Sequence, residues 1–149
     1  MERVSAPALG ALQGEYLLQQ RGRTLKGAGM GQMESRNIDA PDETRPFQAH
    51  GHMDVVTLGD FTLGKGVFEP GWRWSTDVKP IAGTDSCMTR HTGICLSGEM
   101  AVRTDEGTEG TIGPGDVFVL EPGHDAWTVG DEPCVLFDTG VAAYARPAR

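Results

Sequence analysis

Short apolar runs alternate with turn-forming residues along the chain from residue 53 onwards. The runs recur at a spacing of roughly 8–12 residues, and none carries the repeat of about 3.6 residues that marks an amphipathic helix. The expected strands cover residues 54–58, 61–63, 67–68, 72–74, 91–97, 100–104, 108–112, 116–120, 126–129 and 134–138. Such a series of short strands predicts an all-β sandwich or barrel.

The segments between these runs are rich in glycine, proline and acidic residues, which favour tight turns. They stand at residues 59–60, 64–66, 69–71, 105–107 and 130–133. The chain is therefore expected to turn at Gly64-Lys65-Gly66, between two separate strands. Residues 113–124 are the clearest case, since a turn, a short apolar strand and a second turn lead there to a polar residue, His124.

The length of 149 residues fits one domain with a core of its own. Residues 1–36 are rich in small residues, and we expect a mostly mobile N-terminal extension there, with Met33 as the natural start of the chain. A lid or arm that packs on the barrel or on a neighbouring subunit is the alternative. Residues 37–149 then form the single domain, with its core between residues 53 and 138.

Charge and cysteine content restrict the partners. The net charge is −8, and residues 1–33 carry +2, so the remainder carries −10. An acidic body disfavours nucleic acid and anionic membranes as partners. The sequence contains no apolar run near twenty residues and no apolar leader, so neither a membrane span nor a secretory signal is expected. Three cysteines without metal-knuckle spacing favour reduced thiols and a cytoplasmic location.

Two segments carry a family resemblance. Gly115 is followed after five residues by Glu121-Pro122-Gly123, and His91 is followed after six residues by Gly98. Over roughly residues 53–138 the chain resembles the cupin superfamily, whose motifs are G-x5-H-x-H-x3,4-E-x6-G and G-x5-P-x-G-x2-H-x3-N. The second motif is matched with its proline displaced by one, and the first at its end. The resemblance implies a cupin-type jelly-roll barrel, the double-stranded β-helix, and a homodimer.

The metal ligands of typical cupins are two histidines, a glutamate and a final histidine, and this chain departs from all four. His91 stands at the glutamate position and Ala126 at the final histidine position. For the His-x-His pair, counting from Gly71 gives Asp77 and Lys79, whereas counting back from His91 gives Asp85 and Cys87. The usual cupin metal site is therefore expected to be absent. The literal His50-Gly51-His52 lacks a following carboxylate and is not expected to replace it.

Other polar residues can still supply chemistry. His91 is the first candidate for an acid or base, with Asp85 as its carboxylate and Asp77 or His124 as alternatives. Cys87, His91 and His124 form a candidate metal set that suits zinc, while two histidines with a carboxylate would suit iron(II). For each histidine, an ordinary buried or turn residue is the competing interpretation.

Aromatic and cationic residues suggest a ligand cavity. Trp72, Trp74 and Trp127 supply most of the large aromatic area and are candidate walls of a small-molecule pocket. Arg73 is a candidate clamp for a carboxylate. Core packing or a subunit interface is the competing interpretation for the tryptophans.

Three functions follow from these residues. The first is a barrel that binds a small organic molecule without the usual cupin metal. The second is an enzyme that uses His91 for isomerisation, cyclisation or elimination. The third is a metalloenzyme whose zinc or iron is held by Cys87, His91 and His124. Fold alone does not choose among them, so the cofactor is either none or a divalent metal, and catalysis is left open.

Overall fold

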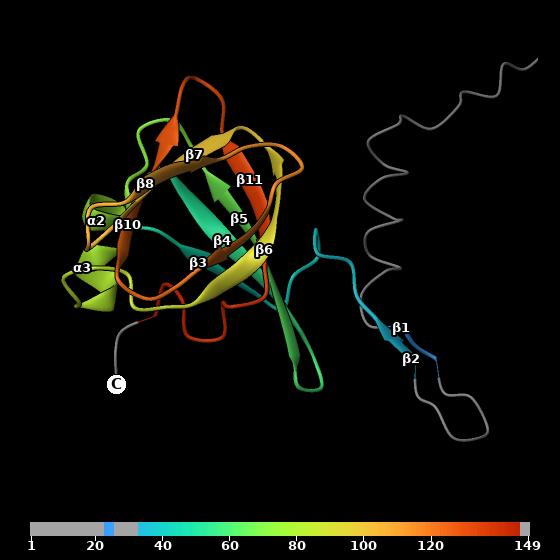
Figure 1. The fold of residues 1–149 in the computed structure, drawn as a ribbon. Coiled ribbons are helices and arrows are strands. Elements are labelled where there is room, and N and C mark those ends of the chain that lie inside the picture. The colour runs from blue at the N-terminus through green and yellow to red at the C-terminus, as the bar shows by residue number, and fades with distance from the viewer. Residues whose placement is uncertain (1–22, 26–32, 147–149) are drawn as a thin grey trace, which may run out of the picture. The chain divides into compact units, whose positions relative to one another are not determined.

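The structure is a computed structural model that describes residues 23–25 and 33–146. It divides the chain into two compact units, residues 1–41 and residues 42–149. Within the described residues the elements are β1 Arg23–Leu25, β2 Met33–Ser35, β3 Glu43–Pro46, β4 Gly51–Leu58, β5 Phe61–Phe68, α2 Trp74–Asp77, α3 Lys79–Ala82, β6 His91–Ser97, β7 Glu99–Thr104, β8 Glu109–Ile112, β9 Val117–Leu120, β10 His124–Val129 and β11 Cys134–Asp138 (Figure 1).

The described residues of the first unit form a short two-stranded pairing. Strands β1 and β2 pair antiparallel, with Arg23 opposite Ser35 and Leu25 opposite Met33. Residues 1–22 and 26–32, which make up most of the predicted extension, lie outside the described residues. The division after Pro41 falls later in the chain than the boundary predicted after residue 36.

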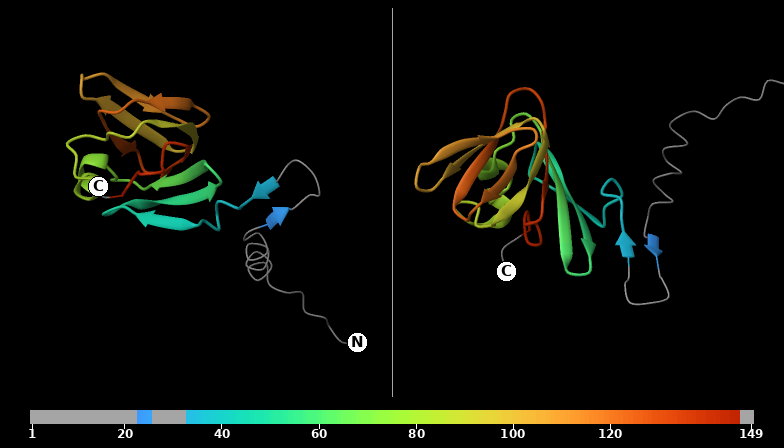
Figure 2. Two further views of the ribbon diagram at one scale, coloured as in Figure 1. Left: turned by 90° about the horizontal axis from the view of Figure 1, so that it is seen from below. Right: turned by 45° about the vertical axis from the view of Figure 1, so that its right-hand side comes forward.

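The second unit is built from two antiparallel sheets. The larger has the strand order β3-β4-β5-β11-β6-β9, and the smaller has the order β10-β7-β8. Figures 1 and 2 show these strands wrapped around one interior, with the short helices α2 and α3 on one side. The prediction of an all-β barrel is therefore confirmed.

Strand alternation decides which side chains face the interior. In β11, Cys134, Leu136 and Asp138 are buried while the residues between them are half-buried. In β10, His124 and Ala126 are likewise both buried, with a half-buried residue between them. Because successive side chains of a strand point to opposite faces, a polar residue in phase with apolar core positions is carried inward. Asp138 and His124 are carried inward in this way.

The turn predicted at Gly64-Lys65-Gly66 is wrong, because these residues lie inside strand β5. The strand runs unbroken from Phe61 to Phe68 and pairs with β4 along its whole length. A Cβ atom added at Gly64 would lie 2.7 Å from Sδ of Met53 and 2.8 Å from Cγ2 of Val141. Gly64 therefore serves close packing inside a strand, which is the other common use of a strand glycine.

The segment after Trp72 also differs from the prediction. Residues 72–74 were expected to form a strand, but Trp74 begins α2, and α3 follows after Val78. Pro80 lies in the first turn of α3, and Gly83 ends it in the left-handed conformation with φ of 74°. Both are ordinary start and stop signals of a helix, although a four-residue helix is too short to give an apolar period. Neither helix, nor any other that the structure describes, is long and apolar enough to cross a membrane.

A buried arginine fixes the C-terminal segment to the barrel. Nη1 of Arg45 donates to the carbonyl oxygens of Val141, at 2.6 Å, and Tyr144, at 2.9 Å. Val141 and Tyr144 are both buried in the core. The aromatic ring of Tyr144 is thereby held edge-on to the imidazole of His91, with a centroid separation of 4.9 Å.

Candidate functional site

Three buried residues from two separate parts of the chain meet inside the barrel. His91 opens strand β6, His124 opens strand β10, and Cys87 lies in the segment before β6. Their side chains each offer one ligand atom, and these atoms all lie within 4.8 Å of one another. The residues are only 2% (Cys87), 6% (His91) and 3% (His124) exposed. We call them the Cys-His-His cluster.

Backbone pairing places Cys87 beside His124. The amide of Cys87 donates to the carbonyl oxygen of His124 at 2.8 Å, and the amide of Gly123 donates to the carbonyl oxygen of Cys87 at 2.7 Å. These bonds form a short β-bridge between residues that are far apart in the sequence. Gly123 has a φ of 93°, a conformation that favours glycine, so the Pro122-Gly123 turn is part of what brings His124 to the cluster.

A carboxylate orients His91. Nδ1 of His91 bonds to Oδ2 of the buried Asp138, and Nε2 lies 3.4 Å from Sγ of Cys87. The other oxygen of Asp138 accepts hydrogen bonds from the amides of Gly140, at 2.7 Å, and Thr92, at 3.3 Å. Asp138 is therefore fixed by the backbone on one side and holds the His91 ring on the other, so that Nε2 faces the cysteine.

A carbonyl group orients His124. Nδ1 of His124 lies 2.7 Å from the carbonyl oxygen of Glu121. Because a carbonyl oxygen can only accept, Nδ1 carries a proton. The other nitrogen, Nε2, lies in the cluster: it can donate to Cys87 when it carries a proton, and it can bind a metal through its lone pair when it does not. Metal-binding histidines typically donate their other ring N–H to a carboxylate or a backbone carbonyl, as both histidines of the cluster do.

The pKa of Cys87 is shifted in the opposite direction from those of the other two cysteines. Burial would raise the pKa of Cys87, but hydrogen bonds from His124 and His91 outweigh it and lower the pKa to about 6. Burial would likewise lower the pKa of His91, but the bonds to Asp138 and Cys87 raise it to about 9. By contrast, burial raises the pKa of Cys134 to about 12. Without a metal, Cys87 and His91 therefore form a thiolate–imidazolium pair at neutral pH, whereas Cys134 stays a thiol.

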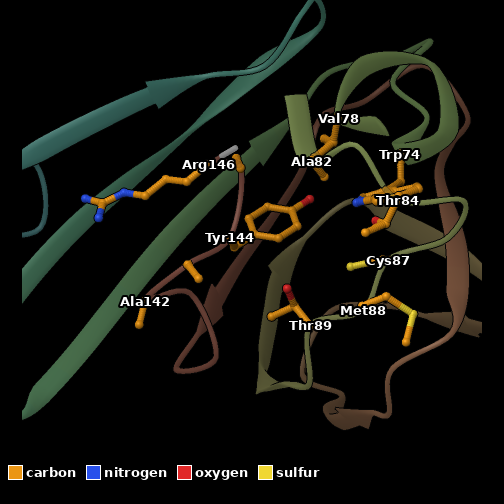
Figure 3. A pocket seen from close by; sticks show the side chains of 12 residues that line it. Trp74, Val78, Ala82, Thr84, Cys87, Met88, Thr89, Ala142, Tyr144 and Arg146 are labelled. Atoms are coloured by element: carbon orange, nitrogen blue, oxygen red, sulfur yellow. The ribbon is translucent and has the colours of Figure 1, made fainter. Parts of the chain in front are cut away.

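Two cavities adjoin the cluster. A small one of about 30 Å³ lies in the barrel interior and is lined by Cys87, His91, His124, Asp138 and apolar residues, so that it has room for an ion or one water molecule. A larger pocket of about 500 Å³ lies outside it (Figure 3). Trp74, Cys87 and Tyr144 line both cavities and form the wall that they share.

Asp85 does not reach the site. Its side chain is fully exposed and lies 3.6 Å from Nζ of Lys79. The carboxylate at His91 is instead Asp138, which sequence reasoning missed. An acidic residue in phase with Cys134 and Leu136 was the signal for it, because such a residue points into the core. The alternative carboxylate, Asp77, is committed elsewhere: its Oδ2 accepts from the amide of Arg73 and bonds Nδ1 of His50, both at 3.0 Å.

Of the four residues predicted to bind a small molecule, the structure brings two to the site and leaves two away from it. Trp72 and Trp74 are buried and line the inner cavity. Trp127 is half-buried, and the Arg73 guanidinium lies over its ring at 4.5 Å from the centroid. Nε of Arg73 also donates to Asp125 at 3.0 Å. Neither Trp127 nor Arg73 lines either of the two cavities at the cluster, so the structure does not bring this pair to the site.

The two remaining histidines lie outside the cluster. His50 bonds Asp77, as described above, and Nε2 of His52 lies 3.4 Å from Oδ2 of Asp54. Tyr144 is the other residue of the site that sequence reasoning missed. It follows the segment covered by the family resemblance, and a lone tyrosine near a chain end gives no signal of its own.

No protein-family model matches the chain. No curated protein matches it either. Solved structures do match: one is described as a sugar phosphate isomerase of the cupin superfamily from Silicibacter pomeroyi, 18% identical over 68% of this chain and 71% of that chain, with a TM-score of 0.51.

Two further structures are similar. The Cnp3 cupin domain of Schizosaccharomyces pombe is 15% identical over 72% of this chain and 74% of that chain, with a TM-score of 0.50. A conserved protein with a double-stranded β-helix domain from Klebsiella pneumoniae is 23% identical over 72% of this chain and 91% of that chain, with a TM-score of 0.48. At these identities the likeness concerns the fold. The two structures with TM-scores of 0.50 and 0.51, together with the two antiparallel sheets described above, show that the chain has the barrel fold of the cupins, as predicted from the resemblance.

Proposed function

We propose that this barrel holds a divalent metal ion, Zn²⁺ in the first place, on Cys87, His91 and His124, and presents it to a small organic molecule in the adjoining pocket. One observation carries the proposal. Three ligand atoms of the types that zinc prefers converge within 4.8 Å in a buried site, and both imidazoles have their Nδ1 atoms engaged elsewhere. The set replaces the usual cupin ligands with different residues.

The donor types favour zinc over iron(II). A thiolate and two imidazoles suit zinc, and three protein ligands leave a position open, as in catalytic zinc sites. The two-histidine, one-carboxylate set of iron(II) is a poorer description, because the carboxylate of Asp138 already bonds His91 and the amide of Gly140. When bound, such a metal supplies Lewis-acid polarisation of a substrate oxygen or activation of a water molecule.

The surrounding residues have distinct tasks. Asp138 holds the proton on Nδ1 of His91, so that Nε2 can ligate. The carbonyl of Glu121 does the same for His124. The apolar rings of Phe68 and Trp72 line the inner cavity, and such low-polarity walls strengthen electrostatic interactions there.

Metal analysis tests the proposal. Protein purified without chelator from cells supplied with zinc, iron and manganese is expected to hold about one ion per chain. C87S, H91A and H124A should each lose most of it, whereas H52A, a histidine outside the cluster, should keep it. Cobalt substitution should add a sulfur-to-metal charge-transfer band that C87S lacks. Wild-type protein that retains no metal after refeeding would overturn the proposal.

A second function is favoured by one observation. Cys87, His91 and Asp138 are hydrogen-bonded in series, which is the arrangement of a nucleophile, a base and the group that orients the base. Without a metal, the barrel would then be an enzyme that uses His91 as an acid or base, with Asp138 in the role first given to Asp85. Both functions use the same atoms, so the metal content of active protein separates them.

A further inference from the structure

The larger pocket is apolar and lies beside the cluster. It is lined from three directions, by α2 and α3, by the segment before β6 and by the C-terminal segment. Its apolar residues are Trp74, Val78, Ala82, Met88, Ala142, Ala143 and Ala145. A pocket of about 500 Å³ with such walls is of the size and type that binds small organic molecules.

The shared wall brings polar atoms to this pocket. Trp74, Cys87 and Tyr144 line it and also line the inner cavity that contains His91 and His124. Figure 3 shows the indole nitrogen of Trp74, the hydroxyl of Tyr144 and the sulfur of Cys87 turned towards the same space. A molecule in the pocket would therefore lie against these three groups and next to the cluster.

Trp74 presents a hydrogen-bond donor with nothing to donate to. The residue is 2% exposed, and its Nε1 has no hydrogen-bond partner within the described part of the chain. An indole N–H can only donate, and a buried donor without an acceptor is costly to a folded protein. The Tyr144 hydroxyl is turned towards the same space and can also donate a hydrogen bond. Two donors thus face one space, which suits an oxygen acceptor.

The charged side chains around the pocket restrict the class of molecule that carries this acceptor. Among the described residues that line the pocket, Arg146 is the one with a basic side chain, and its guanidinium pairs with the carboxylate of Glu43. In Figure 3 the guanidinium lies at the far end of the side chain, away from Cys87 and the Tyr144 hydroxyl. No cation of the described residues is therefore aimed at a ligand here, which disfavours phosphates and polycarboxylates.

We propose that the pocket binds a small, largely apolar carbonyl compound, whose oxygen accepts hydrogen bonds from Nε1 of Trp74 and the hydroxyl of Tyr144. This inference deepens the proposed function and rests on it, because the carbonyl group is placed beside the cluster. Trp74 and Tyr144 are then binding residues that determine specificity. Trp72 and Trp127, the other two tryptophans, have no part in it.

A matched pair of probes tests the inference. Acetophenone and ethylbenzene share a ring and a two-carbon chain and differ in the carbonyl oxygen. We expect zinc-loaded protein to bind acetophenone about tenfold more tightly, which is the usual effect of one buried hydrogen bond. In nitrogen–proton correlation spectra, the indole proton of Trp74 should shift downfield with acetophenone but not with ethylbenzene.

Conservative variants locate the effect. W74F keeps an aromatic ring but removes the N–H, and Y144F removes only the hydroxyl, so each should abolish most of the preference for acetophenone. W127F, at a tryptophan outside the pocket, should leave it unchanged. Any of three results would overturn the inference. The two probes could bind with equal affinity, the preference could survive both W74F and Y144F, or neither probe could bind at millimolar concentration. Metal content is measured on the same samples: a carbonyl preference without metal contradicts only the proposed function, and metal without the preference contradicts only this inference.

Discussion

Replacing Asp138 by asparagine removes a charge without changing the size of the side chain, and it should weaken metal binding at the Cys-His-His cluster. The carboxylate uses one oxygen for Nδ1 of His91 and the other for the amides of Gly140 and Thr92. Asparagine has a single acceptor oxygen. Depending on how its amide turns, either the Nδ1–H group of His91 or the two amides of Gly140 and Thr92 then face an NH₂ group.

This mismatch sets the size of the expected loss in metal affinity or in folding free energy. If the amide keeps the backbone bonds, its NH₂ group faces Nδ1 of His91, and the imidazole must carry its proton on Nε2, the atom that is meant to ligate. Loss of a carboxylate that orients a ligating histidine typically lowers metal affinity about 10- to 100-fold, or about 1.4–2.7 kcal/mol. The alternative amide orientation leaves the part-buried amides of Gly140 and Thr92 without this acceptor, at about 1–3 kcal/mol of folding free energy.

Competition with a chromogenic chelator measures the zinc affinity, and unfolding of the metal-free protein by urea measures stability separately. D54N is the matched control, because Asp54 also lies beside a histidine, His52, but outside the cluster. Zinc affinity should fall in D138N and stay within about twofold of wild type in D54N. An unchanged affinity in folded D138N, or an equal loss in both variants, would refute the reasoning.

Three further predictions concern the site and its supports. In metal-free protein, the ultraviolet absorbance of the Cys87 thiolate should disappear as the pH falls through about 6, and C87A should lack this change; a midpoint at the ordinary cysteine value of about 8.5 would contradict it. R45A should lower the free energy of unfolding in urea by about 3 kcal/mol, because two charged hydrogen bonds to the C-terminal segment are lost. The exposed control R103A should change that free energy by about 0.5 kcal/mol or less, and a loss in R45A no larger than this would contradict the anchoring role. G64A should cost about 1–3 kcal/mol of unfolding free energy, because its Cβ would overlap Met53 and Val141; G110A, whose Cβ would meet nothing within 4 Å, should be nearly neutral, and equal effects would contradict the packing argument.

Much of the fold was predictable because the barrel is built from short strands with ordinary signals. Alternation of apolar and polar residues predicted the strands, and the resemblance around Gly98 and Gly115 predicted the cupin fold. Gly64 and Gly66 led to the wrong prediction of a turn. A glycine that allows close packing inside a strand looks the same in the sequence as one in a turn. The short helices α2 and α3 were missed because four residues cannot show a helical period.

The site was predictable only in part. Cys87, His91 and His124 were named together from residue chemistry and from the cupin frame, and the structure brings their ligand atoms together. Asp85 was chosen as the carboxylate by its nearness in sequence to His91, but Asp138 approaches from a neighbouring strand of the same sheet. Such a partner depends on strand order, which local sequence does not encode. Tyr144 depends on the buried contacts of Arg45 with the C-terminal segment, which are equally non-local.

X-ray absorption at the zinc edge of the purified, zinc-loaded protein tests the central claim most directly. The account predicts one sulfur ligand at about 2.3 Å and two imidazole nitrogens at about 2.0–2.1 Å. The sulfur signal should vanish in C87S, and one imidazole should be lost in H124A. A first shell of oxygen atoms without sulfur, or a sulfur signal that persists in C87S, would contradict the claim that Cys87, His91 and His124 form a metal site.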